Sequence, residues 1–225
     1  MVPPLDQLLF LDLEVTPDGK RLLDAGAILG TREWHSAKLN ELEPWLPDAS
    51  ILAGHNLVRH DLPILLSRFG KDALSDKLFL DTLGWSALLY ADKPYHKLVK
   101  GYQLHDEDAE SNPLSDAKLC RRLLEEMLGQ FAGLDTGLKR AYWGLLHDKQ
   151  GYGPFFRISG YTPLDLNEPP GKSIEERFSG HYCMQADVAT MAREHPIELA
   201  HALALIATVQ MLIQTRQIAE ILQGR

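Results

Sequence analysis

Two apolar segments joined by a turn near the N-terminus constrain the fold of this chain most strongly. Residues 8–15 form an apolar run that ends at Pro17-Asp18-Gly19, and a second strand-like run covers residues 22–30. This pattern predicts a β-hairpin. Because side chains alternate along a strand, Asp12 and Glu14 are expected on one face of its first strand.

Short apolar segments and helical periodicities alternate after the hairpin. Residues 49–54 and 78–80 have the composition of short strands, whereas residues 57–69 and 82–90 have helical spacing. Two strands followed by alternating strands and helices are typical of a mixed sheet with helices packed on it. The sequence therefore predicts the α/β class.

The later part of the chain is predicted to be mostly helical. Asn112 and Pro113 have the residue types of a helix start, an N-cap followed by a proline in the first turn. Residues 186–193 indicate a short helix and residues 196–222 a long one. These helices predict a helical extension at the C-terminus of the chain.

A stretch rich in Gly and Pro, residues 148–172, indicates a surface connection or a small insertion. We accordingly divide the chain into a core of residues 1–147 and a segment of residues 148–225, whose helical extension packs on the core. The long last helix is apolar at positions such as Leu199 and Ile213. A partner-binding surface is the alternative for this helix.

The acidic pair of the first strand is the first candidate site. Asp12 and Glu14 would lie about 6.5–7 Å apart along the strand. Carboxylates on the buried face of a strand are costly unless they are paired or bind a metal. A solvated polar face is the alternative.

Two further acids are expected to point inward from helices. Asp61 lies four residues before Leu65 and shares its helical face, although it could instead cap a helix that begins at Leu62. Asp116 lies four residues before Cys120, also on an inward face. An acid in a first turn is favoured by the helix dipole in any case, which is the alternative for Asp116.

Together these motifs resemble the DEDD (DnaQ-like) 3′→5′ exonuclease superfamily, which has a ribonuclease H-like fold. The resemblance covers about residues 7–130. It rests on a D-x-E in the first strand, a G-x-N-x-x-x-x-D-L-P segment, an Asp-Thr pair and an acid early in a later helix. In this sequence these are Asp12 and Glu14, the segment 54–63 with Asp61, Asp81 and Thr82, and Asp116.

The resemblance implies a ribonuclease H-like mixed sheet flanked by helices and a two-metal nuclease. Its metal ligands, which are also its catalytic residues, would be Asp12, Glu14, Asp61 and Asp116. Oxygen ligands favour Mg²⁺ or Mn²⁺, and two such ions promote hydrolysis of a phosphodiester. The expected substrate is the 3′ end of a single-stranded nucleic acid, DNA in preference to RNA, and the expected product is a nucleoside monophosphate.

The sequence departs from the family at the residue that handles the attacking water. The family usually carries a His five residues, or a Tyr four residues, before its last Asp, and here these positions are Ser111 and Asn112. His105, Tyr102 and His96 are the alternative candidates for this role. Two rival functions stay open: a catalytically impaired module that binds nucleic acid or docks a partner, and a phosphodiesterase for short oligonucleotides.

Charge is distributed unevenly along the chain. The formal net charge is −8, and residues 1–116 hold 19 acidic and 11 basic residues, whereas residues 117–225 hold 12 of each. A basic surface of the kind that binds duplex nucleic acid is not expected. Basic and aromatic residues alternate at Lys93, Tyr95, Lys97, Lys100 and Tyr102, where they could bind phosphates and bases or form an ordinary solvated loop.

Nothing in the sequence indicates an export signal, a membrane span or a disulfide scaffold. The two cysteines, Cys120 and Cys183, show no metal-ligand spacing, and the longest run without charge, residues 199–215, contains polar residues. We therefore expect a cytoplasmic protein. A weaker similarity to exonuclease modules fused to helicases suggests that the chain is part of a longer, helicase-associated protein.

Overall fold

The computed structural model describes residues 5–16, 18, 21–98, 112–183 and 185–222, with side chains described as far as Arg216. Its sheet has five strands in the order β3-β2-β1-β4-β5. The hairpin strands β1 (Leu8–Val15) and β2 (Leu22–Leu29) are antiparallel, as is the edge strand β3 (Arg32–His35) against β2. Strands β4 (Ile51–Gly54) and β5 (Leu78–Asp81) run parallel to β1. The predicted hairpin and mixed sheet are confirmed, and β3 is an addition to them.

Eight α-helices occupy the described residues, and the α/β class is confirmed. Two follow the parallel strands, two come next, and four form the rest of the chain. A 3₁₀ segment, η1, precedes β1, and another, η2, precedes β4. The bounds are η1 Leu5–Gln7, η2 Leu39–Asp48, α1 Asp61–Ala73, α2 Thr82–Leu89, α3 Pro113–Gly133, α4 Thr136–Leu146, α5 Gly153–Ser159, α6 Pro170–Phe178, α7 Val188–Glu194 and α8 Pro196–Leu222.

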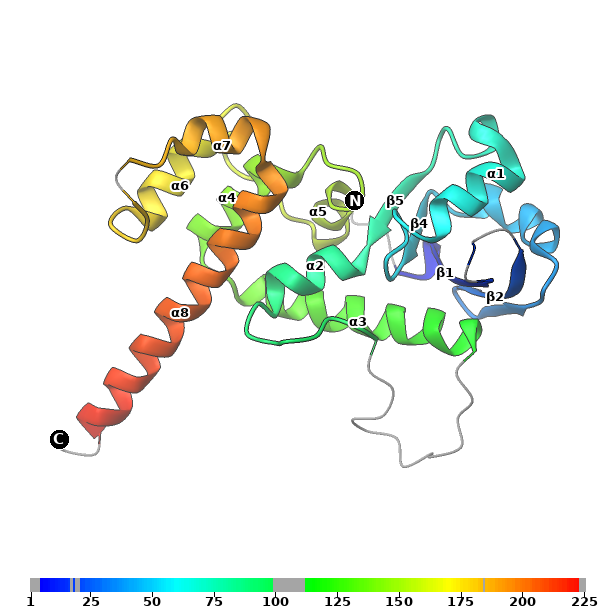
Figure 1. Cartoon of the computed structure of the whole chain (residues 1–225), viewed down its shortest axis with the longest axis horizontal. Helices are drawn as coiled ribbons and strands as arrows, with labels where there is room; N and C mark the ends of the chain where they lie inside the picture. The colour runs from blue at the N-terminus through cyan, green and yellow to red at the C-terminus, as the bar shows by residue number, and fades with distance from the viewer. Residues whose placement is uncertain (1–4, 17, 19–20, 99–111, 184, 223–225) are drawn as a thin grey trace.

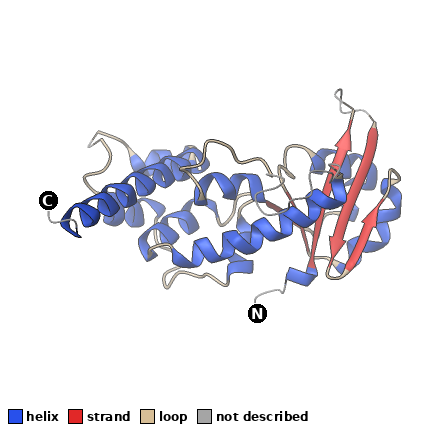
Figure 2. Ribbon diagram, turned by 90° about the horizontal axis from the view of Figure 1, so that it is seen from below, coloured by secondary structure: helices blue, strands red, loops and turns tan. Residues whose placement is uncertain are grey.

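The sheet is covered on both faces. Leu8 and Phe10 of β1 belong to a core cluster shared with α2, α3 and α5, whereas Leu9 and Leu11 belong to a second cluster shared with η2 and α1. The predicted alternation of side chains along the first strand is therefore confirmed. Figure 2 shows the sheet at one end of the molecule and helices over the rest of its length.

The Gly- and Pro-rich stretch is not simply a surface connection. Within it, α5 buries Phe155 and Phe156, and the Phe155 ring stacks on Trp85 with 3.9 Å between ring centroids. Gly151 also forms a bridge with Leu80 of β5. The expectation of a surface connection is wrong for this part, because its aromatic residues complete the core under α2 and α3. Residues 160–169 between α5 and α6 contain exposed side chains such as Leu164.

Only the first half of α8 packs as expected. Leu199 and Leu203 are buried, but Val209 and Ile213 are about half exposed. In Figure 1 the C-terminal half of α8 projects away from the other helices. The segment Pro196–Arg216 is long and apolar enough to cross a membrane by length and composition, and 22% of its most apolar window is buried in the protein. A single such helix is weak evidence for a membrane span.

Candidate active site

A glycine opposite Asp12 lets α3 approach the sheet. Asp12 of β1 pairs with Gly26 of β2, so both positions face the same side. A Cβ atom on Gly26 would lie only 2.0 Å from the backbone nitrogen of Leu114, in the first turn of α3. The helix start therefore rests on the sheet backbone itself. Asp116, in the same turn, is thereby carried towards β1.

Asp61 reaches the same strand from the other side. Strand β4 stops at Gly54, and beyond that point the backbone N–H of Leu13 in β1 donates a hydrogen bond to Oδ1 of Asp61 at 3.2 Å. Asp61 is buried, and its other oxygen, Oδ2, is also buried and has no hydrogen-bond partner among the described residues. Asp61 therefore points at the sheet, as predicted. The alternative, a cap on the helix, is wrong, because α1 begins at Asp61 itself after His60.

The four predicted carboxylates lie close enough to influence one another. Burial raises the pKa of Asp12 to about 7, and the negative charges of Asp61, Asp116 and Glu14 add to the increase. Burial also raises the pKa of Asp61. Folding has thus gathered acids around the C-terminal half of the central strand β1, in surroundings that disfavour their charged forms, which is typical of functional sites.

His60 also belongs to this site, although the sequence motifs did not select it. Its Nδ1 lies 3.1 Å from Oδ1 of Asp61, and this hydrogen bond raises the pKa of the imidazole. The side chain is 43% exposed, and its positive form lowers the pKa of Asp12. Its position directly before Asp61 in the sequence was the available signal.

Asp81 fixes the loop that carries His60 and Asp61. Its carboxylate accepts hydrogen bonds from the backbone N–H groups of Asn56, Val58 and Leu83, at 2.9, 3.1 and 3.0 Å. Asn56 has a φ of 72°, in the left-handed region that non-glycine residues rarely adopt. The Asp81 carboxylate therefore joins the start of α2 to a tightly bent loop and sets the entry to α1.

Two further histidines, His55 and His96, lie against hydroxyl groups of α2. His55 Nδ1 lies 3.0 Å from the Thr82 hydroxyl, and burial lowers the pKa of His55. His96 is one of the alternative candidates for handling the attacking water. Its Nδ1 lies 3.1 Å from the Ser86 hydroxyl. A hydrogen bond with the backbone of His96 and the charges of Asp81 and Asp116 act in the opposite direction and raise the pKa of His55.

Other sequence predictions meet the structure unevenly. Asn112 is the N-cap of α3, where its side chain accepts a hydrogen bond from Ser115 N at 2.9 Å, as predicted. Lys93 lies over the ring of Tyr90, and Tyr95 is 75% exposed. Lys100, Tyr102, His105 and Ser111 lie outside the described residues.

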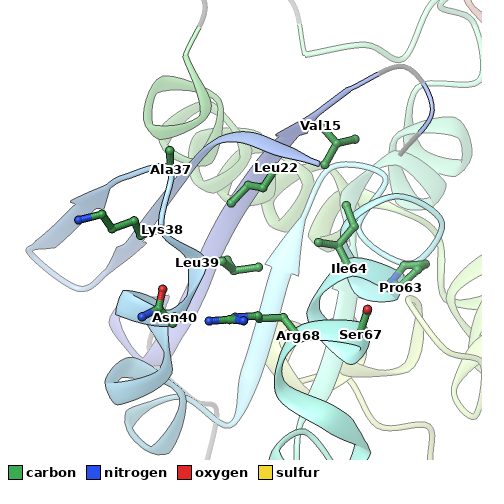
Figure 3. A pocket seen from close by; sticks show the side chains of 10 residues that line it. All are labelled: Val15, Leu22, Ala37, Lys38, Leu39, Asn40, Pro63, Ile64, Ser67 and Arg68. Carbon is green, nitrogen blue, oxygen red and sulfur yellow. The ribbon is translucent and has the colours of Figure 1, made fainter. Parts of the chain in front are cut away.

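A pocket of about 620 Å³ opens beside the end of β1. Its walls come from the residue after Glu14, from the start of β2, from residues 37–40 and from the first turns of α1. In Figure 3 the side chains of Leu22, Leu39 and Ile64 point into it and Lys38 points away. The lining residues are Val15, Leu22, Ala37, Lys38, Leu39, Asn40, Pro63, Ile64, Ser67 and Arg68. The pocket thus combines apolar walls with basic and amide groups and no acid.

The oxygen atoms of these carboxylates are suitable ligands for a divalent cation. Oδ2 of Asp61 is buried without a partner among the described residues, and the pKa of Asp12 stays raised despite the nearby His60, so the charges of both acids are only partly offset. In the described part of the chain, however, no three His, Cys, Asp or Glu side chains are already close enough to hold a metal ion. The structure therefore brings the candidate ligands to one place without forming a closed coordination shell.

Comparisons with protein-family profiles, with curated proteins and with solved structures gave no match.

Proposed function

We propose that this protein is a metal-dependent 3′→5′ exonuclease that hydrolyses the terminal phosphodiester of single-stranded nucleic acid. The observation that carries the proposal is the group of acids in β1, at the start of α1 and in the first turn of α3, where burial and the charges of Asp61 and Asp116 raise the pKa of Asp12. These acids are the ones that the motif resemblance selects. Such gathering of acids is costly unless a cation binds to them.

The sheet supports the finer fold assignment. Its order, β3-β2-β1-β4-β5 with an antiparallel first half, is the arrangement expected of a ribonuclease H-like fold. In that arrangement the first strand is central, and the site lies where its end meets the following helices. We therefore include the ribonuclease H-like fold in the proposal.

Each part of the site has a role in this proposal. Asp12, Glu14, Asp61 and Asp116 would hold two Mg²⁺ or Mn²⁺ ions, which when bound lower the pKa of a water and offset the charge of the leaving oxygen. The Leu13 N–H and the His60 ring orient the Asp61 carboxylate. His60, with Nδ1 on Asp61 and an exposed ring, is well placed to bind a water or a phosphate oxygen.

The test measures release of mononucleotides from a labelled single-stranded oligonucleotide. We expect wild-type protein to release them from the 3′ end with Mg²⁺ or Mn²⁺ and to stop when EDTA is added. Asp61→Asn should abolish release, and Asp76→Asn, at an exposed acid before β5, should not. A folded wild-type protein that releases nothing from DNA or RNA in either metal would refute the proposal.

A second candidate is a module that binds nucleic acid without cutting it. The observation in its favour is that Asn112, at a position where the family carries a Tyr, serves as a helix cap. It predicts binding of a labelled strand, measured by fluorescence anisotropy, with no release of product. A phosphodiesterase for short oligonucleotides would instead act faster on dinucleotides than on longer strands. The link to a helicase and the cytoplasmic location stay predictions.

A further inference from the structure

Helix α8 has a second apolar face that the other described residues leave uncovered. Its inner face buries Leu199, Ala200, Leu203 and Ala204 against the neighbouring helices α2, α4 and α7. On the other side Leu205, Val209 and Leu212 are 55%, 54% and 57% exposed. Exposed apolar residues are common singly, but a continuous row on one helix indicates an interaction surface.

The exposed row has the spacing of a coiled-coil seam. It consists of six exposed residues, which we call the outer stripe: Glu198, Ala202, Leu205, Val209, Leu212 and Arg216. Successive members are separated by four, three, four, three and four residues, an average close to the 3.5 of a two-helix seam. The stripe covers about 27 Å of helix at 1.5 Å per residue. Figure 1 shows α8 beginning beside the other helices and its C-terminal half projecting away from them.

The outer stripe is complementary to itself when reversed. Its spacing is the same from either end, so in an antiparallel pair centred at Ala207 each member faces another member. Glu198 of one copy then faces Arg216 of the other, and Ala202 faces Leu212, a small residue against a large one. Leu205 faces Val209 at the centre. In a parallel pair, by contrast, Glu198 would face Glu198 and Arg216 would face Arg216.

We propose that α8 forms an antiparallel homodimer through the outer stripe. The projecting half of each α8 lies on the outer face of the partner's first half, whose inner face is already covered by the partner's own helices. A membrane fits these observations less well, because the outer stripe carries a charge at both ends and because the first half of α8 is held against the protein. Two helices of this length make a small interface, so we expect a weak dimer that dissociates on dilution.

The first experiment is sedimentation of the full chain over the micromolar concentration range. We expect the average mass to rise from monomer towards dimer as the concentration increases. Leu205→Glu and Val209→Lys should each weaken the dimer about tenfold or more, because each buries an unpaired charge at the centre of the seam. Met211→Glu is the matched control: Met211 is also an exposed apolar residue of α8, but it lies off the outer stripe, and its change should leave the dimer intact.

Mixing the two weakened variants tests the antiparallel register. In a mixed dimer the new Glu of one chain faces the new Lys of the other, and on the other side of the centre native Val209 faces native Leu205. Equal amounts of Leu205→Glu and Val209→Lys should therefore form a dimer at concentrations where either variant alone is monomeric. Three results would overturn the proposal. The first is a wild-type protein that stays monomeric, whether or not it binds phospholipid vesicles. The second is a single variant that dimerises like wild type, and the third is a mixture of the two variants that stays monomeric.

Discussion

Acidic residues have opposite surroundings at the two ends of the molecule: basic partners at one end and other acids at the other. In the helical part, Arg140 pairs with Glu168 and Glu176, and Arg177 pairs with Asp135. Around β1, by contrast, Asp61 is buried and Asp12 is partly buried, with other acids near them. The same contrast shows in the sequence, where residues 117–225 are electrically balanced and residues 1–116 carry the excess of acids.

The direction of the pKa shifts expresses this difference. The Arg140 guanidinium lowers the pKa of Glu168, whereas burial and neighbouring acids raise the pKa of Asp12 to about 7. Paired acids near the surface stabilise the fold slightly, and gathered buried acids destabilise it. An arrangement that lowers stability is retained where it serves a function, so we expect catalysis at the acids around β1.

Removal of the Asp12 charge should have the largest effect. Asp12→Asn is expected to reduce nuclease activity at least about a hundredfold, because it removes a proposed metal ligand. The same change should raise the melting temperature of the metal-free protein at pH 8, because a buried repelling charge is lost. Rates on a labelled strand and thermal melts measure both effects. Lower stability together with unchanged activity would show that Asp12 serves the fold alone.

The pH dependence of stability should carry the signature of Asp12. Its pKa in the folded protein, about 7, exceeds its ordinary value of 3.8, so the folded state holds this proton more tightly than the unfolded state. The resulting contribution, roughly 2–4 kcal/mol, is present in full below about pH 4 and is lost as the pH rises to 7.

Chemical denaturation of wild type and Asp12→Asn between pH 4 and pH 8 isolates this contribution. The difference in the free energy of unfolding between the two proteins should change over that interval. Mg²⁺ or Mn²⁺ at pH 8 should restore stability to wild type and not to Asp12→Asn. Equal stabilisation of both proteins by the metal would place the metal elsewhere.

A methyl group at Gly26 should separate α3 from the sheet. Gly26→Ala places a Cβ atom 2.0 Å from the Leu114 nitrogen, so we expect a loss of about 1–3 kcal/mol in stability and a lower activity as Asp116 moves away. The control is Gly129→Ala in α3, where a Cβ atom would meet open space. This change should instead stabilise the protein by up to about 1 kcal/mol. Equal effects of the two changes, measured by urea denaturation, would contradict the close approach.

The smallest effect is expected in the helical part. Glu168→Gln removes a surface ion pair with Arg140, which is worth less than about 1 kcal/mol. The contribution of Glu168, whose pKa is lowered, is present above about pH 4.5 and is lost as the pH falls, opposite in sign to that of Asp12. Activity should not change. A large loss of activity in Glu168→Gln would remove the contrast between the two regions.

Local patterns were sufficient for most elements. The turn after β1, the Asn112 cap and the proline at the start of α8 are signals within a few residues, so the hairpin and these helices are predictable. The inward direction of Asp61 followed from helical periodicity. Helix α5 was missed because its glycine and prolines outweigh its short apolar segment, and only contact with Trp85 explains the burial of Phe155.

The sequence by itself determined the alternation of acids along β1, the helical faces of Asp61 and Asp116, and the uneven distribution of charge. These are properties of local periodicity and composition. Only the tertiary structure decided that these acids meet, that Gly26 makes room for α3, that Asp81 bends the loop before Asp61, and that half of α8 stays uncovered. Those outcomes depend on where distant segments pack, because a pKa, a close approach or an exposed face is set by atoms far apart in the chain.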